Sequence, residues 1–280
     1  MEKPLVSIII TTYHNPERLR KALKTVKNQT YKNKQVIVVD GSNQQENQDI
    51  CNKENIIYLK VPEEVVEWEG AKAVQRQRNI GCKYSAGDWI AMLDDDDEWE
   101  ENKIEKQVVH IKQGIGLITC WTKTITEDGY FLDKPDRVIE YKDLLRNFNL
   151  SNTSSYFIRK EALEEVGWWD ENVKGMHEYD IALKLAKIKW DIVSVCLPLL
   201  IRNRDYHEQL GSMYWKIAEQ FQFWQRYGED VFKELGFING IKKGIMTVGL
   251  IGAYFSGYLL HNHIWKAIYP IKGMLEGYGG

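Results

Sequence analysis

The chain has 280 residues, and 37 Lys and Arg against 40 Asp and Glu give a net charge of −3. Apolar residues make up 44% and charged residues 28%, which is typical of a soluble globular protein. These values exclude a disordered chain, a collagen-like repeat and a strongly basic nucleic-acid-binding protein, so we expect no nucleic-acid partner. Seven acids nevertheless lie in the window 94–101, and the rest of the chain carries 37 basic and 33 acidic residues, a net charge of +4.

The first hundred residues alternate between strand and helix signals. The apolar runs predict buried strands at 5–12, 35–39, 56–59 and 88–93, with helices at 16–28, after residue 42, and at 70–84. Asn15 is the expected N-cap of the first helix, with Pro16 at its first position. Continuous apolar strands that alternate with helices predict an α/β fold, in which helices flank a mostly parallel central sheet.

The pattern changes after the acidic window. Helices are predicted at 103–112 and 179–189, a strand at 116–121, a hairpin turn at 127–130, and a strand leading into a helix at 157–165. From residue 212 onward the chain is predicted to be helical. We therefore expect one catalytic α/β domain at 1–212 and a helical C-terminal extension at 213–280.

The longest apolar run covers residues 244–260 and follows Lys242 and Lys243. It is shorter than the ~20 residues that a membrane-spanning helix needs, and glycines interrupt it. Two interpretations stay open. The run is either a helix buried against the catalytic body, or a helix in the membrane interface with lysines, tyrosines and Trp265 at the headgroups. The second would give peripheral membrane contact through residues 241–270.

The four cysteines, at positions 51, 82, 120 and 196, show no C-x-x-C spacing. Free thiols of this kind fit a reducing cytosol. The apolar stretch at 5–10 is too short for the core of a signal peptide. We expect a cytoplasmic protein, with a peripheral position on the cytoplasmic face of the membrane as the alternative.

Polar clusters follow three of the predicted strands, at 11–13, 40–42 and 94–97. Ligands of open parallel sheets bind at the carboxyl ends of the strands, so the three clusters predict one site. Adjacent carboxylates repel one another, and a positive partner is therefore expected among Asp94–Asp97. Oxygen ligands suit Mg²⁺ or Mn²⁺ that shares a phosphate with the protein. The alternative is a solvated loop that supplies acids to the next helix, and this suffices for Glu100 and Glu101.

An ordered set of motifs resembles the family 2 glycosyltransferases, which have the GT-A fold. The resembling segments are 6–15, 29–31, 36–42, 78–81, 87–99, 158–160, 166–171 and 177–180. The resemblance covers about residues 5–212. It implies the transfer of a sugar from a nucleotide-diphosphate donor to an acceptor hydroxyl, usually with inversion at the anomeric carbon.

The resemblance also implies roles for single residues at the strand ends. Thr11 and Tyr13 would contact the nucleoside, Asp40 the base, Arg78 the base or phosphates, Asp94 and Asp95 the ribose, and Asp96 the metal ion. The base is commonly uracil in this family, which would make the donor a UDP-sugar. The family usually has two acids before Gly-Ser, whereas Val39-Asp40 supplies only one here, which weakens the assignment of uracil.

The general base for the acceptor hydroxyl is expected in the segment 177–180. By the resemblance it is Glu178, with Asp180 as the second choice, while His177 takes the place of an acid. The alternative is that both acids only complement the dipole at a helix start.

Three further residues are candidates near this site. His207 resembles a histidine that closes the active site in relatives, where it would ligate the metal or contact the diphosphate, although a solvated loop histidine is equally compatible. Trp168 and Trp169 could stack on an acceptor sugar, with core packing as the alternative for one of them. The acceptor would be a glycan or a polyprenyl-linked sugar.

Two other functions compete with sugar transfer. A sugar nucleotidyltransferase would need a glycine-rich phosphate loop after the first strand, and residues 11–15 contain no glycine. A non-catalytic nucleotide- or glycan-binding module would be expected to lack the acidic motif or the base, and the sequence retains both.

Overall fold

The computed structural model describes residues 3–42, 44–61, 71–147, 150–173, 175–203 and 212–260. The chain forms two compact units, Met1–Asp205 and Tyr206–Gly280. The first unit contains the sheet and all of the predicted polar clusters. The second contains two long helices.

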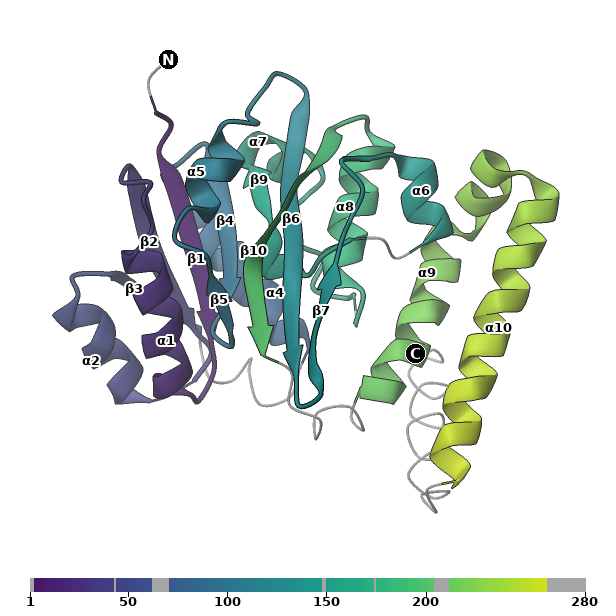
Figure 1. Ribbon diagram of the computed structural model, residues 1–280, viewed down its shortest axis with the longest axis horizontal. Helices are drawn as coiled ribbons and strands as arrows, with labels where there is room; N and C mark the ends of the chain where they lie inside the picture. Colours follow the sequence, from purple (N-terminus) through teal and green to yellow (C-terminus); the bar gives the residue numbers. More distant parts are fainter. Residues whose placement is uncertain are drawn as a thin grey trace. The chain divides into compact units, whose positions relative to one another are not determined.

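One mixed sheet forms the centre of the first unit (Figure 1). Its strands are β1 (Val6–Thr12), β2 (Lys34–Asp40), β3 (Ile57–Lys60), β4 (Trp89–Asp94), β5 (Asp97–Trp99), β6 (Ile115–Thr126), β7 (Gly129–Asp133), β8 (Val138–Ile139), β9 (Phe157–Arg159) and β10 (Asp191–Asn203). Their order is β3-β2-β1-β4-β9-β6-β10-β5, with β7 on β6 and β8 on β10. The run β3-β2-β1-β4 is parallel, as is β6–β10, whereas β9 is antiparallel to both of its neighbours. The predicted α/β fold is confirmed.

The strand β10 is the main element that the sequence analysis did not predict. It pairs with β6 along almost its whole length, but the register shifts on both sides of Pro198. Proline cannot donate a ladder hydrogen bond and therefore sits at irregularities of strands. The interrupted pattern around Pro198 hides the strand from a search for regular periodicity.

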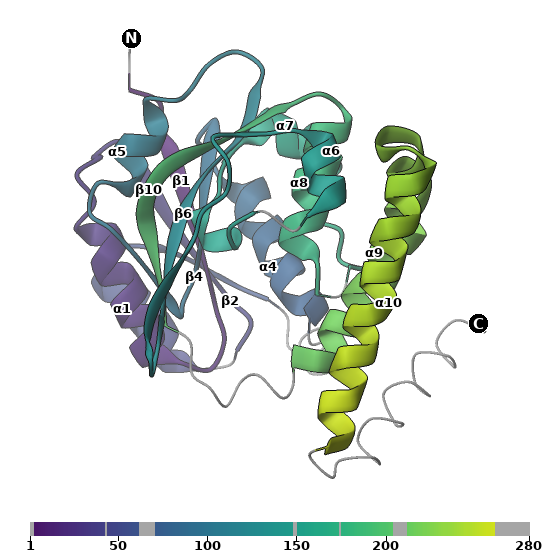
Figure 2. The same cartoon turned by 45° about the vertical axis from the view of Figure 1, so that its right-hand side comes forward.

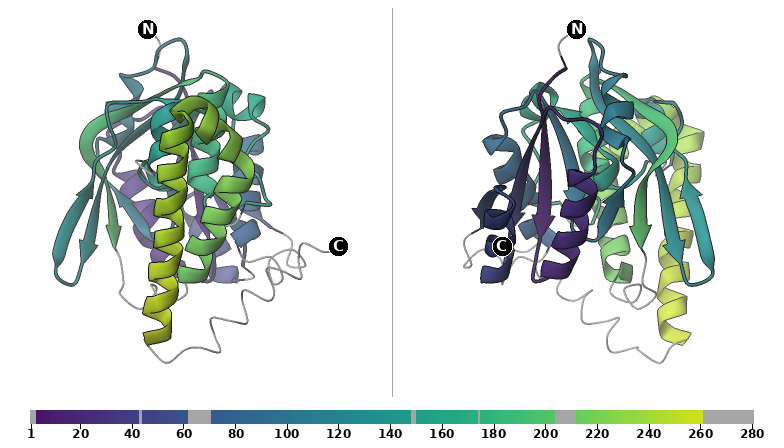
Figure 3. Two further views of the ribbon diagram at one scale, coloured as in Figure 1. Left: turned by 90° about the vertical axis from the view of Figure 1, so that its right-hand side faces the viewer. Right: turned by 60° about the vertical axis from the view of Figure 1, so that its left-hand side comes forward.

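Helices cover both faces of the sheet (Figure 3). They are α1 (Pro16–Lys27), α2 (Gln45–Lys53), α4 (Ala71–Tyr84), α5 (Lys103–Val108), α6 (Tyr141–Arg146), α7 (Lys160–Glu165) and α8 (His177–Lys187), with the 3₁₀ turn η1 (Thr153–Ser155). The side chain of Asn15 accepts a hydrogen bond from the Arg18 N–H at 3.0 Å, which confirms the predicted cap of α1.

Alternate residues of β1 point to opposite faces of the sheet, so the strand is buried on both sides. Ile8 and Ile10 share one core with Leu19 and Leu23 of α1. Ile9 faces α4, where a Cβ added to Gly81 would lie 2.4 Å from the Ile9 side chain. The absence of a side chain at Gly81 is what lets α4 lie this close to β1.

The described part of the second unit, residues 212–260, is a pair of helices, α9 (Ser212–Leu235) and α10 (Phe237–Leu260), joined at Gly236. They lie side by side and antiparallel (Figure 2). The Trp224 indole N–H donates to Thr247 Oγ1 at 3.1 Å and fixes their register. Gly236 has a φ of +79°, which suits a residue without a Cβ at the turn. Among the described helices, none is long and apolar enough to cross a membrane.

Candidate active site

The carboxyl ends of β1, β2 and β4 lie side by side at one edge of the sheet. The strand register places Thr12 beside Asp40 and Thr11 beside Asp94. The three polar clusters predicted from the sequence are therefore brought together. This edge is where ligands of open parallel sheets bind.

Asp94 is held by charge and by hydrogen bonds. Arg78 Nη2 donates to its two oxygens at 3.0 and 3.1 Å, and the Thr11 hydroxyl donates at 2.8 Å. Burial alone would raise the pKa of Asp94, but the Arg78 guanidinium and these hydrogen bonds outweigh it and lower the pKa. Asp94 is therefore a carboxylate at neutral pH. Arg78 is itself buried on α4, where its guanidinium contacts Asp94 and the ring of Trp169.

The ionised forms of Asp95 and Asp97 are disfavoured by their surroundings. Burial, together with the charge of Asp96, raises the pKa of Asp95 to about 6, although the Thr12 hydroxyl donates to it at 2.6 Å. Burial and the charges of Asp96 and Asp94 raise the pKa of Asp97 to about 7. Asn152 donates to Asp97 at 3.0 Å. Loss of a proton from these acids is opposed by their neighbours, and a bound cation would relieve the repulsion.

Asp96 differs from the other three in its exposure. Asp94 and Asp95 are partly buried, Asp97 is buried, and Asp96 is exposed to solvent. Partial desolvation at the crowded strand end and the charge of Asp94 raise its pKa, against the opposing charges of Arg18 and Arg202. Among Asp94–Asp97, Asp96 is thus the acid that can reach a ligand without breaking a side-chain hydrogen bond to another described residue.

The donor set fits Mg²⁺ or Mn²⁺ that shares its coordination with a substrate. Among the described residues, no group of three or more His, Cys, Asp or Glu side chains could hold a metal ion. Such ions commonly bind through one or two carboxylates, waters and substrate phosphates, and do not need a cage made by the protein. Asp96, exposed at the end of β4, meets that requirement. The other predicted metal ligand, His207, lies outside the described residues.

Asp40 is enclosed in a network of its own. It is fully buried, and its carboxylate accepts four hydrogen bonds within the chain. The donors are the backbone N–H and hydroxyl of Ser42, both at 2.7 Å, and Asn47 Nδ2 and the Tyr58 hydroxyl, both at 2.9 Å. In this conformation Asp40 presents no oxygen to a base. The geometry assigns it to shaping the turn after β2.

Tyr13 forms an exposed wall beside this turn. Half of its surface is accessible, and its ring meets that of His14 edge to face, with centroids 4.2 Å apart. His14 has a φ of +52°, so the chain turns sharply after β1. Gln77 of α4 donates to the backbone of Thr12 at 2.8 Å and closes the floor below Gly41. The arrangement leaves part of the Tyr13 side chain exposed at the strand ends.

The start of α8 faces the same part of the sheet. His177 Nε2 lies 3.0 Å from a carboxylate oxygen of Glu178, and the side chain of Glu178 is 33% exposed. Burial lowers the pKa of His177, against the charge of Glu178, so the imidazole is neutral at pH 7. The start of α8 lies near β4, because the Tyr156 hydroxyl donates to the Glu178 carbonyl at 2.8 Å and the Tyr156 carbonyl accepts the Met92 N–H of β4 at 3.1 Å.

Asp180 lies on a more deeply buried side of α8 than Glu178. It is 1% exposed, and its carboxylate is 4.0 Å from the ammonium of Lys184. Glu178 is therefore the acid at this helix start that an acceptor could reach. Asp180 instead lies buried beside Lys184, one turn further along α8.

The two candidate tryptophans have different surroundings. Trp169 is 2% exposed, with the guanidinium of Arg78 5.0 Å from its ring centroid and Tyr156 stacked at 6.5 Å. It belongs to the core, which corrects the expectation that it stacks on a sugar. Trp168 is only partly buried and has a φ of +67°. Of the pair, only Trp168 is partly exposed, and the ammonium of Lys83, near the end of α4, lies 6.0 Å from its ring centroid.

The sequence analysis missed residues that reach the acidic window from η1. Ser154 Oγ accepts the backbone N–H of Asp94 at 3.0 Å, and its carbonyl accepts the indole N–H of Trp99 at 2.8 Å. Asn152 and Ser154 lie more than fifty positions from their partners, so no local pattern could have indicated the contact. They fix the turn that aims Asp96 outward.

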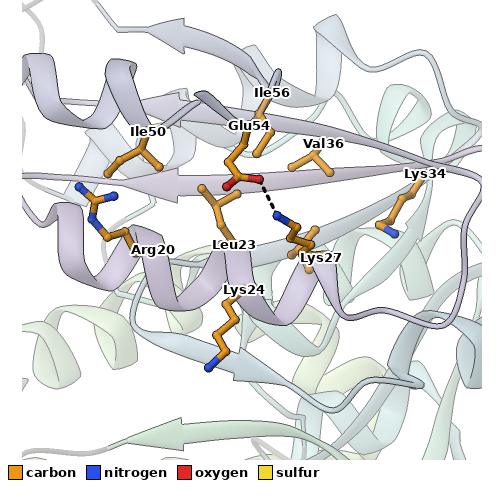
Figure 4. Close-up of a pocket in the computed structure, with 10 residues that line it drawn as sticks. Arg20, Leu23, Lys24, Lys27, Lys34, Val36, Ile50, Glu54 and Ile56 are labelled. Atoms are coloured by element: carbon orange, nitrogen blue, oxygen red, sulfur yellow. Dashed lines mark hydrogen bonds and ion pairs between the residues drawn. The ribbon is translucent and has the colours of Figure 1, made fainter. Parts of the chain in front are cut away.

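A pocket of about 450 Å³ lies elsewhere, between α1, α2 and the sheet (Figure 4). Its lining includes Leu23, Lys34, Ile50 and Ile56, and an ion pair between Lys27 and Glu54, 2.9 Å apart, crosses it. Lys34 and Ile56 stand at the amino ends of β2 and β3. The pocket is thus at the opposite end of the strands from the acidic window, and we assign it no part in the chemistry.

Curated glycosyltransferases are similar to this sequence over half or more of its length. An uncharacterized glycosyltransferase of Methanocaldococcus jannaschii is 27% identical over 80% of this chain and 86% of its own. The amylovoran biosynthesis glycosyltransferase AmsB of Erwinia amylovora is 28% identical over 69% of this chain and 67% of its own. The Escherichia coli enzyme WfaP, a UDP-Glc:α-D-GlcNAc-diphosphoundecaprenol β-1,3-glucosyltransferase, is 35% identical over 52% of this chain and 58% of its own.

Solved structures share the fold. The mannosyltransferase PcManGT of Pyrobaculum calidifontis, solved with GDP-Man and Mn²⁺, matches 99% of this chain and 82% of its own with a TM-score of 0.63 and 14% identity. The S. aureus protein TarS, residues 1–349 with UDP-GlcNAc, matches 78% of this chain and 66% of its own with a TM-score of 0.60 and 14% identity. The sequence profile of glycosyl transferase family 2 matches residues 7–167. The chain therefore belongs to glycosyl transferase family 2 and is a glycosyltransferase of the GT-A fold.

Proposed function

We propose that the protein transfers a sugar from a nucleotide-diphosphate donor to an acceptor hydroxyl, with a divalent cation and with inversion at the anomeric carbon. The observation that carries this proposal is the presence of two accessible acids close to β4. Asp96 is exposed just after β4, and Glu178 is partly exposed at the start of α8, which Tyr156 connects to β4. One acid can serve the diphosphate through a cation, and the other the acceptor.

Asp96 would hold Mg²⁺ or Mn²⁺, and the bound ion would neutralise charge on the leaving diphosphate. A cation is needed here because the negative charge of residues 94–97 would otherwise repel a diphosphate. His207, from the family resemblance, is the proposed second ligand. The solved mannosyltransferase with Mn²⁺ supports the choice of ion.

Glu178 would accept the proton of the acceptor hydroxyl as that oxygen attacks the anomeric carbon. The new glycosidic bond forms while the bond to the diphosphate breaks, so the proton ends on Glu178 and the negative charge leaves with the nucleotide. The neutral His177 beside it adds no positive charge that would weaken the base. Attack opposite to the leaving group inverts the anomeric configuration.

The donor is proposed to be a UDP-sugar. Tyr13 would pack on the nucleoside, Thr11 would hold Asp94 in place, and Asp94 and Asp95 would face the ribose. Asp40 would act indirectly, by shaping the turn at Gly41 and Ser42. The name of the E. coli relative and the UDP-GlcNAc complex of TarS support a uridine nucleotide, whereas PcManGT was solved with GDP-Man.

The acceptor is proposed to be a lipid-linked glycan at a membrane surface, with residues 1–212 as the catalytic domain and 213–280 as an extension. The diphosphoundecaprenol substrate in the name of the E. coli relative supports a lipid-linked acceptor. Trp168, which is only partly buried, is the proposed contact for an acceptor sugar.

The test is a donor screen with the purified chain. A panel of UDP-, GDP- and dTDP-sugars is incubated with Mn²⁺, and released nucleoside diphosphate is measured. We expect release with a UDP-sugar and its loss on addition of EDTA. Tight nucleotide binding without release from any donor, in the presence of lipid-linked acceptors, would favour the non-catalytic module.

Single substitutions then separate the roles. Asp96→Asn should abolish metal-dependent donor binding, whereas Asp88→Asn, an exposed acid just before the same strand, should leave it unchanged. Glu178→Gln should keep donor binding and reduce transfer by about 10²- to 10⁴-fold. If Glu178→Gln transfers normally while Asp180→Asn does not, the base has been assigned to the wrong acid.

A further inference from the structure

The second unit carries an exposed apolar surface that the proposed reaction does not use. We call it the outer face of α10, and it consists of Phe237, Ile238, Ile241, Lys242, Ile245, Met246 and Val248. Ile238 and Val248 are each 70% exposed, and Ile245 is 67% exposed. A large exposed patch of apolar side chains commonly marks a surface that binds another molecule.

The contacts within the helix pair show why this face is left open. A Cβ added to Gly240 would lie 2.4 Å from the Phe232 ring, and Thr247 accepts the Trp224 indole N–H at 3.1 Å. Positions 240, 244 and 247 share one side of α10, so small residues line its contact with α9. Positions 238, 241, 245 and 248 share another side. The helix thus packs on α9 through its small residues and presents its large ones outward.

The charge of α10 indicates what can cover the outer face. Residues 237–260 contain no Asp or Glu, and their only charged side chains are Lys242 and Lys243. Lys242 is exposed on the outer face, while the ammonium of Lys243 lies 4.7 Å from the ring centroid of Phe223. A second copy of the same face would bring Lys242 against a basic surface without an acid to pair with it. An anionic lipid surface offers both the apolar interior and the complementary charge.

We propose that the outer face of α10 lies flat on an anionic lipid surface. Ile238, Ile245 and Val248 would enter the boundary between headgroups and acyl chains, and Lys242 would meet the anionic headgroups. The inference does not depend on the proposed reaction, although it would bring the enzyme to the surface where a lipid-linked acceptor resides.

The test is flotation of the full chain with liposomes. Vesicles of phosphatidylcholine alone are compared with vesicles that contain one quarter phosphatidylglycerol. We expect the chain to float with the anionic vesicles. The triple variant Ile238→Gln, Ile245→Gln and Val248→Gln should lower partitioning by more than about tenfold. Lys242→Gln should lower it by about fivefold, because one basic residue near an anionic surface contributes that much.

The matched control lies in the first unit. Val109 and Val138 are 70% and 61% exposed, so Val109→Gln with Val138→Gln removes similar apolar surface elsewhere and should leave flotation unchanged. Circular dichroism checks that each variant folds. The proposal is overturned if the wild type binds the anionic vesicles no more than it binds pure phosphatidylcholine vesicles. It is equally overturned if the triple variant floats like the wild type. It is also overturned if sedimentation shows a dimer that the triple variant dissociates and that does not bind vesicles. No donor enters the assay, so an inactive enzyme would still report on lipid binding.

Discussion

The buried contact between Arg78 and Asp94 offers a sharp test of how the acidic window is held. The guanidinium side chain is 2% exposed and the carboxylate 29%, and their closest atoms are 3.0 Å apart. Fully buried pairs cost about 3–5 kcal/mol when one partner is removed, and exposed pairs about 0–1 kcal/mol. Because Asp94 is partly exposed, we expect removal of one partner to cost an amount between these limits, about 2 kcal/mol.

Arg78→Met retains most of the side-chain stem and removes the charge. The variant also loses the contact of the guanidinium with Trp169, worth about 1 kcal/mol. Against that, Arg78 Nε and Nη1 are buried without a hydrogen-bond partner among the described residues, and their removal relieves about 1 kcal/mol or more. These two effects offset one another, so we expect Arg78→Met to lower the free energy of unfolding by about 2 kcal/mol.

The assay is urea unfolding of four proteins, the wild type, Arg78→Met, Asp94→Asn and the double variant, at pH 7. Each single variant should lose about 2 kcal/mol, and the double variant clearly less than the sum, with a coupling energy of at least about 1.5 kcal/mol. The pKa of Asp94 is lowered from 3.8, so the stabilisation is present above that value and is lost as the pH falls below it. Additive losses at pH 7, within about 0.5 kcal/mol, would refute the reasoning.

Three further outcomes are expected from other parts of the chain. Gly81→Ala should destabilise the protein by about 1–3 kcal/mol, because its Cβ would lie 2.4 Å from Ile9, whereas Gly249→Ala, with no heavy atom within 4 Å, should stabilise α10 by up to about 1 kcal/mol in thermal unfolding. Burial lowers the pKa of Lys103 from 10.5 to about 8, so the unfolded chain binds more protons between these values and stability due to this group rises with pH. The difference in unfolding free energy between Lys103→Met and the wild type should therefore shrink by about 2–3 kcal/mol from pH 8 to 10.5, and a constant difference would contradict the buried charge. Asp40→Asn should cost about 2 kcal/mol in urea unfolding, because its amide nitrogen would replace an oxygen that accepts two of the four hydrogen bonds around Asp40.

Local pattern was sufficient to predict most strands and helices of the first hundred residues. The apolar run before Thr12 and the Asn15-Pro16 pair mark the end of β1 and the start of α1, and both depend only on neighbours in the chain. The placement of polar residues after apolar strands also predicted that residues 11–13, 40–42 and 94–97 would meet, since parallel strands end at a common edge.

The roles within that edge depended on partners far away in sequence. Asp40 and Asp96 are both acids at strand ends, yet Asp40 is enclosed by Asn47 and Tyr58 while Asp96 faces solvent. Trp168 and Trp169 are adjacent in the chain, and only the packing of Arg78 and Tyr156 makes the second a core residue. A residue type cannot reveal such differences, because burial is a property of what packs against the side chain.

The acidic window shows where the boundary between the two sources of information lies. From the sequence alone, the adjacent acids Asp94–Asp97 predict a positive partner, since like charges repel at short range whatever the fold. In the tertiary structure these acids have different surroundings. Arg78 donates to Asp94, Thr12 to Asp95 and Asn152 to Asp97, while Asp96 faces solvent. Electrostatic repulsion follows from composition, but its relief depends on which distant groups the fold brings within about 3 Å.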